Sequence, residues 1–296
     1  MCLTKTCLTG QKIDGILVAN SVKERTRAAV AELKKEGVEP CLATVLVGDD
    51  PASASYVASK QRDCSEVGIA TKDHRLPNDF SQKELESLID LLNNERPVHG
   101  ILLQLPLPEH LDEFSAISKI SPLKDVDGLT PYNMGLLASG KALLKPCTPS
   151  GIMELFDYYS IELSGKHAVI INRSNLVGKP LYHLLLEKDA TVTTCHSKTR
   201  DLVTFCRGAD IVITAVGNRA KFTLTGDMIK DGAVVVDVGT SRIGGRLAGD
   251  VDYESVIKKA SFATPVPGGV GPMTRAMLLK NTITAASISK GIAKYS

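Results

Sequence analysis

Short apolar segments alternate with helix-like segments along the chain, and this alternation constrains the fold more than any other feature. Cys41–Val47 (CLATVLV), His167–Ile171 (HAVII) and residues 233–238 (AVVVDV) are apolar and too short for typical helices. The stretches between such segments carry apolar residues at helical spacing, with polar residues or glycine at their ends. Strands that alternate with helices usually form parallel sheets. The sequence therefore predicts an α/β fold.

The length of 296 residues predicts two domains, since a domain commonly holds about 100–200 residues. Four elements are expected in the first domain: a helix that begins at Asn20 or Ser21 and ends near Gly37, a strand at Cys41–Val47, a helix at residues 53–68 and a strand at residues 100–104. Residues 145–151 (KPCTPSG) favour a crossover to the second domain.

The second half of the chain reads as a β-α-β series of the Rossmann kind. Its expected strands are His167–Ile171, Thr191–Cys195 and residues 211–215 and 233–238, with a helix from about Val177. A last helix at residues 273–292 is long enough to return to the first domain. We therefore expect two three-layer α/β domains with a cleft between them. Residues 1–147 plus 273–296 form the first, and residues 148–272 form a Rossmann-like second.

Composition argues against several classes of protein. The formal net charge is only +2, whereas nucleic-acid binders usually carry a basic face, so no nucleic-acid partner is expected. No apolar run approaches the ~18 residues of a membrane-spanning helix, and residues 1–10 do not resemble a secretory signal. The seven cysteines are scattered and show no C-x-x-C pair. They predict reduced thiols in a cytoplasmic protein without a metal site.

The loop after HAVII, residues 172–180 (NRSNLVGKP), is a candidate dinucleotide site that lacks the usual G-x-G-x-x-G. The order of a strand, a polar turn and a helix is still present, and free amides at the helix N-terminus can hold phosphate. Asn172 stands where a glycine is usual, and asparagine tolerates positive φ better than most residues. Gly178 permits close backbone approach. On this loop alone, an ordinary β–α turn explains the sequence equally well.

The end of the next strand favours NADP over NAD. NAD enzymes place an acidic residue there to hold the ribose 2′-hydroxyl, but this strand ends in Cys195-His196-Ser197-Lys198-Thr199-Arg200. Arg173 and Ser174 in the preceding turn suit a 2′-phosphate, through charge-assisted hydrogen bonds. His196 is expected to be a solvated loop residue.

Three polar residues of the first domain are candidates for chemistry. Tyr56 and Lys60 are four residues apart and share a helix face, where the ring can stack on a flat heterocycle and the amine can act. A surface pair is the more common explanation of such spacing. Gln104 ends a strand, where it either caps or hydrogen-bonds the lysine or a substrate carbonyl. Asp127 either pairs with an aminopyrimidine-type edge or shapes the turn before Gly128.

Together these motifs resemble the bifunctional methylenetetrahydrofolate dehydrogenase/methenyltetrahydrofolate cyclohydrolase (FolD-type) family. The matching motifs follow the family's order and cover nearly the whole chain: Asp50-Pro51-Ala52-Ser53-x-x-Tyr56-Val57-x-x-Lys60, Gln104-Leu105-Pro106-Leu107-Pro108, Lys124-Asp125-Val126-Asp127-Gly128, Pro146-Cys147-Thr148-Pro149, Arg173-Ser174-x-x-Val177-Gly178-x-Pro180, Cys195-His196-Ser197-x-Thr199 and Thr264 through Thr274. Each motif alone is weak, whereas the ordered set is specific.

The resemblance implies two successive reactions in one cleft of a homodimer. NADP-dependent oxidation turns 5,10-methylenetetrahydrofolate into the 5,10-methenyl cation, and hydrolysis then gives 10-formyltetrahydrofolate. The implied catalytic residues are Lys60 for the hydrolytic half, Gln104 as its tuning partner, Tyr56 as the folate-stacking ring and Asp127 as the pterin anchor. Further folate contacts are implied for Leu103, Gln104, Leu105, Pro267, Gly268, Gly269, Val270 and Gly271. Cofactor contacts are implied for Asn172, Arg173, Ser174, Ser197 and Thr240.

Two residues depart from the family pattern. Asn172 replaces the family's usual glycine, and Thr240 stands where the family commonly has isoleucine. Both positions bear on how the cofactor is held.

The chemistry predicts different demands for the two reactions. Loss of hydride leaves a cation that two folate nitrogens stabilise, so this step needs positioning. Attack by water needs a group that manages protons, and a lysine can do this if burial or a neighbouring cation lowers its pKa. We hypothesise that Lys60 is at least partly neutral in the working complex.

Two other functions fit parts of the sequence. Tyr56 and Lys60 also match the Y-x-x-x-K motif of short-chain dehydrogenases, which act on other substrates. Those enzymes, however, bind their nucleotide before this motif in the chain, and here the Rossmann-like series follows it. The second alternative is a regulatory module that binds NADP or folate without turnover.

Overall fold

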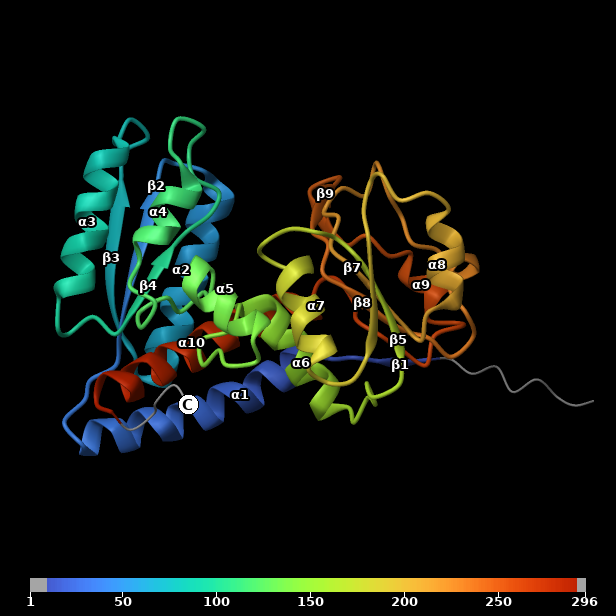
Figure 1. Ribbon diagram of the computed structural model, residues 1–296, viewed down its shortest axis with the longest axis horizontal. Helices are drawn as coiled ribbons and strands as arrows, with labels where there is room; N and C mark the ends of the chain where they lie inside the picture. The colour runs from blue at the N-terminus through green and yellow to red at the C-terminus, as the bar shows by residue number, and fades with distance from the viewer. Residues whose placement is uncertain (1–9, 292–296) are drawn as a thin grey trace, which may run out of the picture. The chain divides into compact units, whose positions relative to one another are not determined.

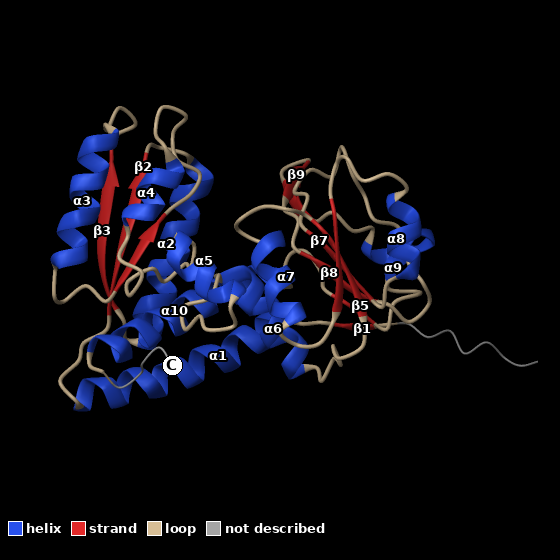
Figure 2. Cartoon of the chain, in the orientation of Figure 1, coloured by secondary structure: helices blue, strands red, loops and turns tan. Residues whose placement is uncertain are grey.

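The computed structural model describes residues 10–291, except for the side chain of Ala52. These residues form two compact units, which we name by their sheets. The six-stranded unit contains residues 10–18 and Thr148–Thr274, and the three-stranded unit contains Ala19–Cys147 and the residues from Arg275 onward. Both units are α/β (Figures 1 and 2). Residues 10–18 thus group with the later residues, although the expected division assigned them to the first domain.

The chain passes between the units within three helices. These are α1 (Gly15–Lys35), α6 (Cys147–Tyr158) and α10 (Val270–Ser289). The last helix begins three residues before the predicted start at 273, and the predicted end at 292 lies outside the described residues.

The three-stranded unit is built on β2 (Cys41–Val47), which is buried along its whole length. It lies between β3 (Ala70–Leu76) and β4 (Gly100–Leu103), and all three strands are parallel. Two helices, α3 (Gln82–Asn94) and α4 (Glu113–Lys119), pack on one face through a core that includes Val45, Leu85, Ile89 and Leu103. The strands also contact α2 (Pro51–Val67), and α5 (Pro131–Ala138) follows the turn after α4.

Local capping sets the ends of α1 and α2. The side chain of Asp50 accepts a hydrogen bond from the Ser53 amide at 2.7 Å, and α2 ends at Gly68 with φ 84°. The predicted start of α1 at Asn20 or Ser21 is wrong. The carboxylate of Asp14 accepts hydrogen bonds from the amides of Ile16 and Leu17, both at 3.1 Å, so the helix begins at Gly15.

All strands of the six-stranded sheet are parallel. Their order is β1 (Gln11–Lys12), β11 (Phe262–Ala263), β8 (Val234–Asp237), β7 (Ile211–Thr214), β5 (His167–Ile171) and β6 (Thr191–Cys195). The chain order reverses between β5 and β7. Open α/β sheets bind ligands outside the carboxyl ends of strands at such a switch point.

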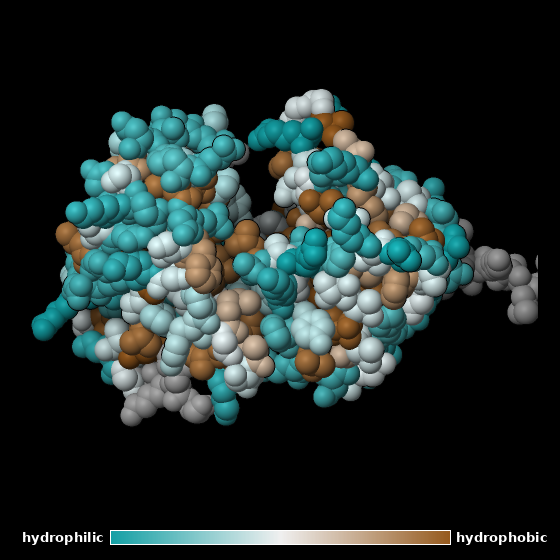
Figure 3. All heavy atoms as spheres, turned by 45° about the horizontal axis from the view of Figure 1, so that its top comes forward, coloured by the Kyte–Doolittle hydropathy of each residue, from teal (hydrophilic) through white to brown (hydrophobic). Residues whose placement is uncertain are grey.

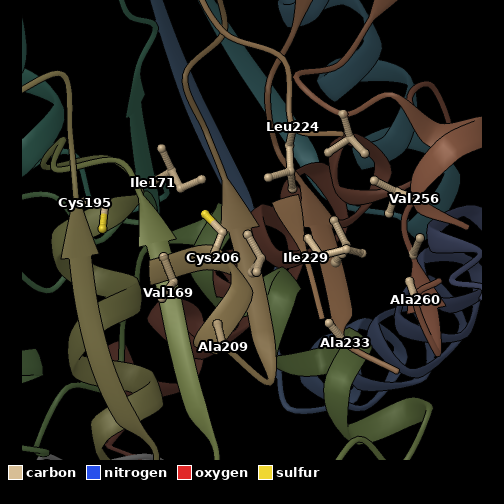
Figure 4. Packing of buried hydrophobic residues seen from close by; sticks show 14 residues of the cluster. Val169, Ile171, Cys195, Cys206, Ala209, Leu224, Ile229, Ala233, Val256 and Ala260 are labelled. Atoms are coloured by element: carbon tan, nitrogen blue, oxygen red, sulfur yellow. The ribbon is translucent and has the colours of Figure 1, made fainter. Parts of the chain in front are cut away.

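Helices cover the six-stranded sheet and bury its apolar residues. Two of these helices are α7 (Gly178–Leu186), which follows β5, and α8 (Leu202–Gly208), which follows β6. Figure 4 shows one cluster of the core, in which Val169 and Ile171 of β5 lie near Cys206 of α8. The remaining elements are η1 (Gly226–Met228), the hairpin of β9 (Ser241–Ile243) and β10 (Arg246–Ala248), and α9 (Tyr253–Val256).

The surface of the described residues is mixed in character. The face seen in Figure 3 carries hydrophilic side chains with scattered apolar ones. Within residues 10–291, every helix is too short or too polar to span a membrane.

Candidate functional site

The predicted Tyr56–Lys60 pair exists, and Gln104 joins it. The Lys60 side chain crosses the Tyr56 ring with its Nζ 4.8 Å from the ring centroid. The same Nζ donates a hydrogen bond of 3.1 Å to Oε1 of Gln104, as the sequence suggested. Gln104 is itself fixed, because its backbone amide donates to the Val45 carbonyl and its Nε2 donates to the Leu105 carbonyl at 2.7 Å. The amine is therefore held in one place by an acceptor that cannot carry charge.

Burial weakens the preference of Lys60 for its charged form. The residue is only 6% exposed, and this burial lowers the pKa of its amine. The nearby Asp127 carboxylate acts in the opposite sense and raises the pKa of Lys60. Burial likewise raises the pKa of Asp127, and Lys60 opposes that shift. A lowered pKa gives this lysine a larger neutral fraction than an exposed lysine has at the same pH, and the neutral amine can accept a proton.

The turn that carries Asp127 is anchored by the acid two residues before it. The Asp125 carboxylate accepts hydrogen bonds from the Leu129 amide (3.1 Å), the Thr130 amide (2.8 Å) and Nδ2 of Asn133 (2.9 Å). Of the two acids in this motif, Asp125 therefore performs the turn chemistry. The same explanation had been open for Asp127, whose carboxylate lies close to Lys60 instead.

A second anchor, Asn281 of α10, was not expected from the sequence. Its Nδ2 donates hydrogen bonds of 2.8 Å to the carbonyl oxygens of Val126 and Lys145. An added Cβ at Gly128 would lie 2.6 Å from the Lys145 carbonyl carbon, so the two segments are in tight contact. No local pattern connects position 281 with position 126, because the link is made only by the fold.

Cys147 was also missed as a neighbour of the site. Its thiol lies within hydrogen-bond reach of the Asp127 carboxylate and 3.3 Å from the Val126 carbonyl oxygen. Burial raises the pKa of this thiol well above its usual value, so it stays protonated and can donate. Its place in the segment KPCTPSG was the one sequence feature that could have pointed to a role for Cys147 near the site.

In the six-stranded unit, Asn172 closes the turn between β5 and α7. Its Oδ1 accepts hydrogen bonds from the amides of Ser174 (2.7 Å) and Gly178 (3.0 Å). Its Nδ2 donates to the Ala215 carbonyl just after β7, at 2.7 Å. The expected reason for asparagine was wrong, since Asn172 is not among the described residues with positive φ. The side chain serves as a hydrogen-bonding bridge across the switch point.

The first turn of α7 does not offer the free amides that the sequence predicted. The Gly178 amide is bound by Asn172, and the Lys179 amide donates to the Ser174 carbonyl at 3.0 Å. Pro180 has no N–H, and the Leu181 amide donates to the Val177 carbonyl. Gly178 does provide the expected close approach, because an added Cβ would lie 2.2 Å from the Asn172 carbonyl oxygen.

Arg173 and Ser197 lie at corresponding places just after two adjacent strands. Ile171 of β5 pairs with Cys195 of β6, and each polar residue follows two positions later. Both are exposed. Ser174 accepts the Val177 amide through Oγ at 3.1 Å, which leaves its hydroxyl proton to donate. These residues suit an anionic group at this edge of the sheet. His196 lies in the turn after β6, where its Nδ1 accepts the Lys198 amide at 3.2 Å.

Thr240 is exposed and follows a loop that two buried acids hold. Asp237 accepts hydrogen bonds from the amides of Gly239, Asp250 and Val251 at 2.9–3.0 Å. Burial raises the pKa of Asp237 to about 6. An added Cβ at Gly239 would lie 2.1 Å from the Asp250 carboxyl carbon, so only glycine fits beside that acid.

Asp250 binds the chain that leaves β7. It is fully buried, and it accepts hydrogen bonds from the Thr214 hydroxyl (2.9 Å) and from the amides of Val216 (2.6 Å) and Gly217 (3.0 Å). We expect Asp250→Ala to lower the free energy of unfolding by about 3–5 kcal/mol, because the buried Thr214 hydroxyl and two part-buried amides lose a charged acceptor. Urea unfolding measures this loss.

Asp252→Ala is the control for that experiment. Asp252 lies two residues away and makes no side-chain cap bond to α9. A change within about 0.5 kcal/mol is expected for it. Equal losses for the two variants would contradict the role given to Asp250.

The glycine-rich segment after β11 also belongs to the six-stranded unit. The Gly268 carbonyl accepts the Gly15 amide at 2.9 Å, and an added Cβ at Gly15 would lie 1.8 Å from the Gly269 oxygen. Pro267 and Gly271 are exposed, whereas Val270 is buried and already begins α10. The segment therefore packs against the start of α1, and the structure groups it with Asn172 and Thr240 in that unit.

Comparison with known proteins gives consistent results for both units. Residues 13–127 match the family model of the tetrahydrofolate dehydrogenase/cyclohydrolase catalytic domain, and residues 146–290 match that of its NAD(P)-binding domain. The chain is 67% identical to "Bifunctional protein FolD" of Nitrosopumilus maritimus, over 97% of this chain and all of the relative. It is 54% identical to the protein of that name from Moorella thermoacetica, over 94% of this chain and 99% of the relative.

Similar solved structures belong to the same kind of enzyme. A bifunctional methylenetetrahydrofolate dehydrogenase/cyclohydrolase from Campylobacter jejuni has a TM-score of 0.91 and 47% identity, covering 94% of this chain and 99% of that one. A Trypanosoma brucei relative complexed with NADP and an inhibitor has a TM-score of 0.89 and 39% identity, covering 95% and 98%. The chain belongs to the tetrahydrofolate dehydrogenase/cyclohydrolase family.

Proposed function

We propose that this chain oxidises 5,10-methylenetetrahydrofolate to 5,10-methenyltetrahydrofolate and then hydrolyses that product to 10-formyltetrahydrofolate. The Campylobacter jejuni relative carries both activities in its name, and the two family models describe a catalytic domain and an NAD(P)-binding domain of a dehydrogenase/cyclohydrolase. The observation that carries the proposal is the buried Lys60, held by Gln104 beside Tyr56 and Asp127. A non-catalytic binding module has no need of a buried amine whose pKa is lowered.

The oxidation half depends mainly on orientation. NADP, when bound, accepts the hydride that leaves the methylene carbon. The protein's task is to hold the folate so that this carbon faces the cofactor. Tyr56 offers a ring face for stacking, and the Asp127 carboxylate offers acceptors for the N–H donors of the pterin. The remaining folate contacts, at residues 103–105 and 267–271, rest on the family resemblance.

The hydrolysis half needs a proton acceptor. Water adds its oxygen to the methenyl carbon, and neutral Lys60 Nζ takes the proton that this water loses. The remaining hydroxyl then loses its proton as its oxygen becomes the formyl oxygen, the bond from that carbon to N5 breaks, N5 takes a proton, and the formyl group stays on N10. One proton is released overall. Gln104 Oε1 holds the amine in place without adding charge. A carboxylate at this position would favour the charged amine, whereas the uncharged amide does not.

We propose NADP as the cofactor, held in the six-stranded unit by Arg173, Ser174 and Ser197, with Asn172 and Thr240 nearby. The exposed Arg173 guanidinium at the carboxyl edge of β5 supports this choice, as does the lack of an acid at the end of β6. The NADP-complexed relative supports it independently.

Arg173→Ala is expected to raise the Kd for NADP by about 10- to 100-fold, because one charge-assisted contact to the 2′-phosphate is lost. The Kd for NAD should change little, since NAD has no such phosphate. Isothermal titration with each nucleotide measures both values. Arg207→Ala is the control, because Arg207 ends α8 just before β7 begins, at the other end of the strands. Equal weakening of NAD and NADP would contradict the assignment.

The other parts of this account are proposals of the same kind. The three-stranded unit binds folate, the six-stranded unit binds the nucleotide, and the enzyme works as a homodimer. A cytoplasmic location is supported by five described cysteines, all buried free thiols. The comparisons lend no support to a regulatory module or to a dehydrogenase of another class.

The proposal is tested by supplying the purified chain with 5,10-methylenetetrahydrofolate and either NADP or NAD. Reduction of NADP followed by conversion of the methenyl product to 10-formyltetrahydrofolate is expected. Binding of both ligands without turnover would overturn it.

A further inference from the structure

The amide side chain of Asn172 occupies backbone donors at the place where parallel α/β proteins hold a phosphate. This turn joins β5 to α7 at the switch point of the sheet, where dinucleotide pyrophosphates usually meet a helix N-terminus. The amides of Ser174 and Gly178 both point at Oδ1 of Asn172. A donor that is already engaged gains little by turning to a phosphate.

Other amides at the start of α7 are engaged as well. In the first turn of α7, Lys179 and Leu181 donate to carbonyl oxygens of the turn, and Pro180 has no N–H. The Val177 amide donates to the Ser174 hydroxyl oxygen. Oδ1 of Asn172 is the one side-chain acceptor that takes two of these amides at once, among residues 172–181 of the structure.

The same side chain is fixed from the other side. Its Nδ2 donates to the Ala215 carbonyl at 2.7 Å, which ties the turn to the chain leaving β7. Since Nδ2 is bound there, Oδ1 cannot rotate away without breaking that bond. The two amides therefore stay covered unless three hydrogen bonds break together.

We infer that Asn172 determines whether this protein binds the cofactor mainly through its pyrophosphate or through its 2′-phosphate. It keeps the Ser174 and Gly178 amides from the pyrophosphate, so more of the nucleotide affinity depends on the 2′-phosphate at Arg173 and Ser197. This inference rests on the proposed NADP-dependent function and adds the reason why that phosphate matters in this chain. NAD, which lacks the 2′-phosphate, should bind weakly.

Asn172→Ala isolates the effect, because alanine keeps Cβ and removes both the acceptor and the donor. The probes are ADP-ribose, which has the pyrophosphate without a 2′-phosphate, and 2′-AMP, which has the 2′-phosphate without a pyrophosphate. Titration calorimetry should show roughly tenfold tighter binding of ADP-ribose and NAD, because two amides become free. NADP should gain by the same factor, whereas 2′-AMP should bind unchanged.

Two further variants complete the design. Asn172→Asp keeps two acceptor oxygens over the amides and adds charge, so it should not tighten ADP-ribose. Asn175→Ala removes an exposed side chain of the same turn, whose Oδ1 binds only Lys179 Nζ, and should change neither probe. Unchanged 2′-AMP binding shows that the variants are folded, and Asn172→Gly repeats the test if the alanine variant fails to fold.

Each outcome decides the point. Tighter ADP-ribose binding by Asn172→Ala alone supports the inference. Unchanged or weaker ADP-ribose binding, with 2′-AMP binding intact, overturns it while leaving NADP as the cofactor. If the unaltered chain bound neither NADP nor 2′-AMP, the proposed cofactor itself would be wrong.

Discussion

Lys60→Met is expected to lower cyclohydrolase turnover by about 10²- to 10⁴-fold, the usual contribution of a positioned acid–base group. The methionine side chain is close in length to the apolar methylene chain of lysine. It can therefore fill the buried site beside Tyr56 without leaving a charge or an empty space. Hydride transfer should fall much less, because that step needs orientation rather than a proton acceptor. The two halves are measured separately, with methenyltetrahydrofolate supplied directly for the hydrolysis.

Arg62→Met is the matched control for this variant. Arg62 lies two residues further along α2, is exposed and donates to the Ser59 hydroxyl. It should leave both activities near their normal values. Full cyclohydrolase activity in Lys60→Met would contradict the assignment of the proton acceptor.

The pH dependence of hydrolysis follows from the same group. Burial lowers the pKa of Lys60, and only its neutral form accepts a proton. The cyclohydrolase rate should therefore rise with pH as Lys60 loses its proton, and level off above that pKa. Stability should rise over the range from this lowered pKa up to the ordinary lysine value, because the unfolded chain binds the extra proton there.

Asp127→Asn has the second large expected effect, which is a loss of folate affinity of about 10- to 100-fold. An amide offers one acceptor oxygen where the carboxylate offers two, and its NH₂ group faces the N–H donors of the pterin. Titration with the folate substrate measures the loss, while NADP affinity should stay the same. Asp49→Asn is the control, because Asp49 is an exposed residue of the loop before α2.

The same variant should also move the pH profile of any remaining hydrolysis. The Asp127 carboxylate raises the pKa of Lys60, in opposition to burial. Without that charge the pKa of Lys60 falls further, so the rising limb of the profile shifts to lower pH. An unchanged profile, or a shift to higher pH, would contradict the coupling of the two residues.

The sequence could predict the elements whose signals are local. The Tyr56–Lys60 face follows from spacing alone, and β2 and β5 appear as apolar runs at the predicted residues. By contrast, β3 was not predicted. Its residues ATKDHRL are mostly polar and none of them is buried, because it pairs at the sheet edge through its backbone. The two-residue strands β1 and β11 are too short to leave a pattern.

Residues that act through distant partners could not be predicted from the sequence. Asn281 reaches the Asp127 turn from more than 150 positions away, at Val126, and Asp250 binds amides that follow β7. Asn172 was recognised as a departure from glycine, but its role was assigned to backbone φ. Two of its side-chain bonds are local, but the bond from Nδ2 depends on where Ala215 lies, which only the sheet order determines.

The most direct test of the division of labour at Lys60 compares two products in one reaction. The chain is given 5,10-methylenetetrahydrofolate and NADP, and NADPH and methenyltetrahydrofolate are followed together. In the unaltered chain, methenyltetrahydrofolate should remain well below the NADPH formed, because hydrolysis consumes it. In Lys60→Met the two should accumulate one for one. Equal shortfalls of methenyltetrahydrofolate in both proteins would contradict the central claim that Lys60 opens the ring.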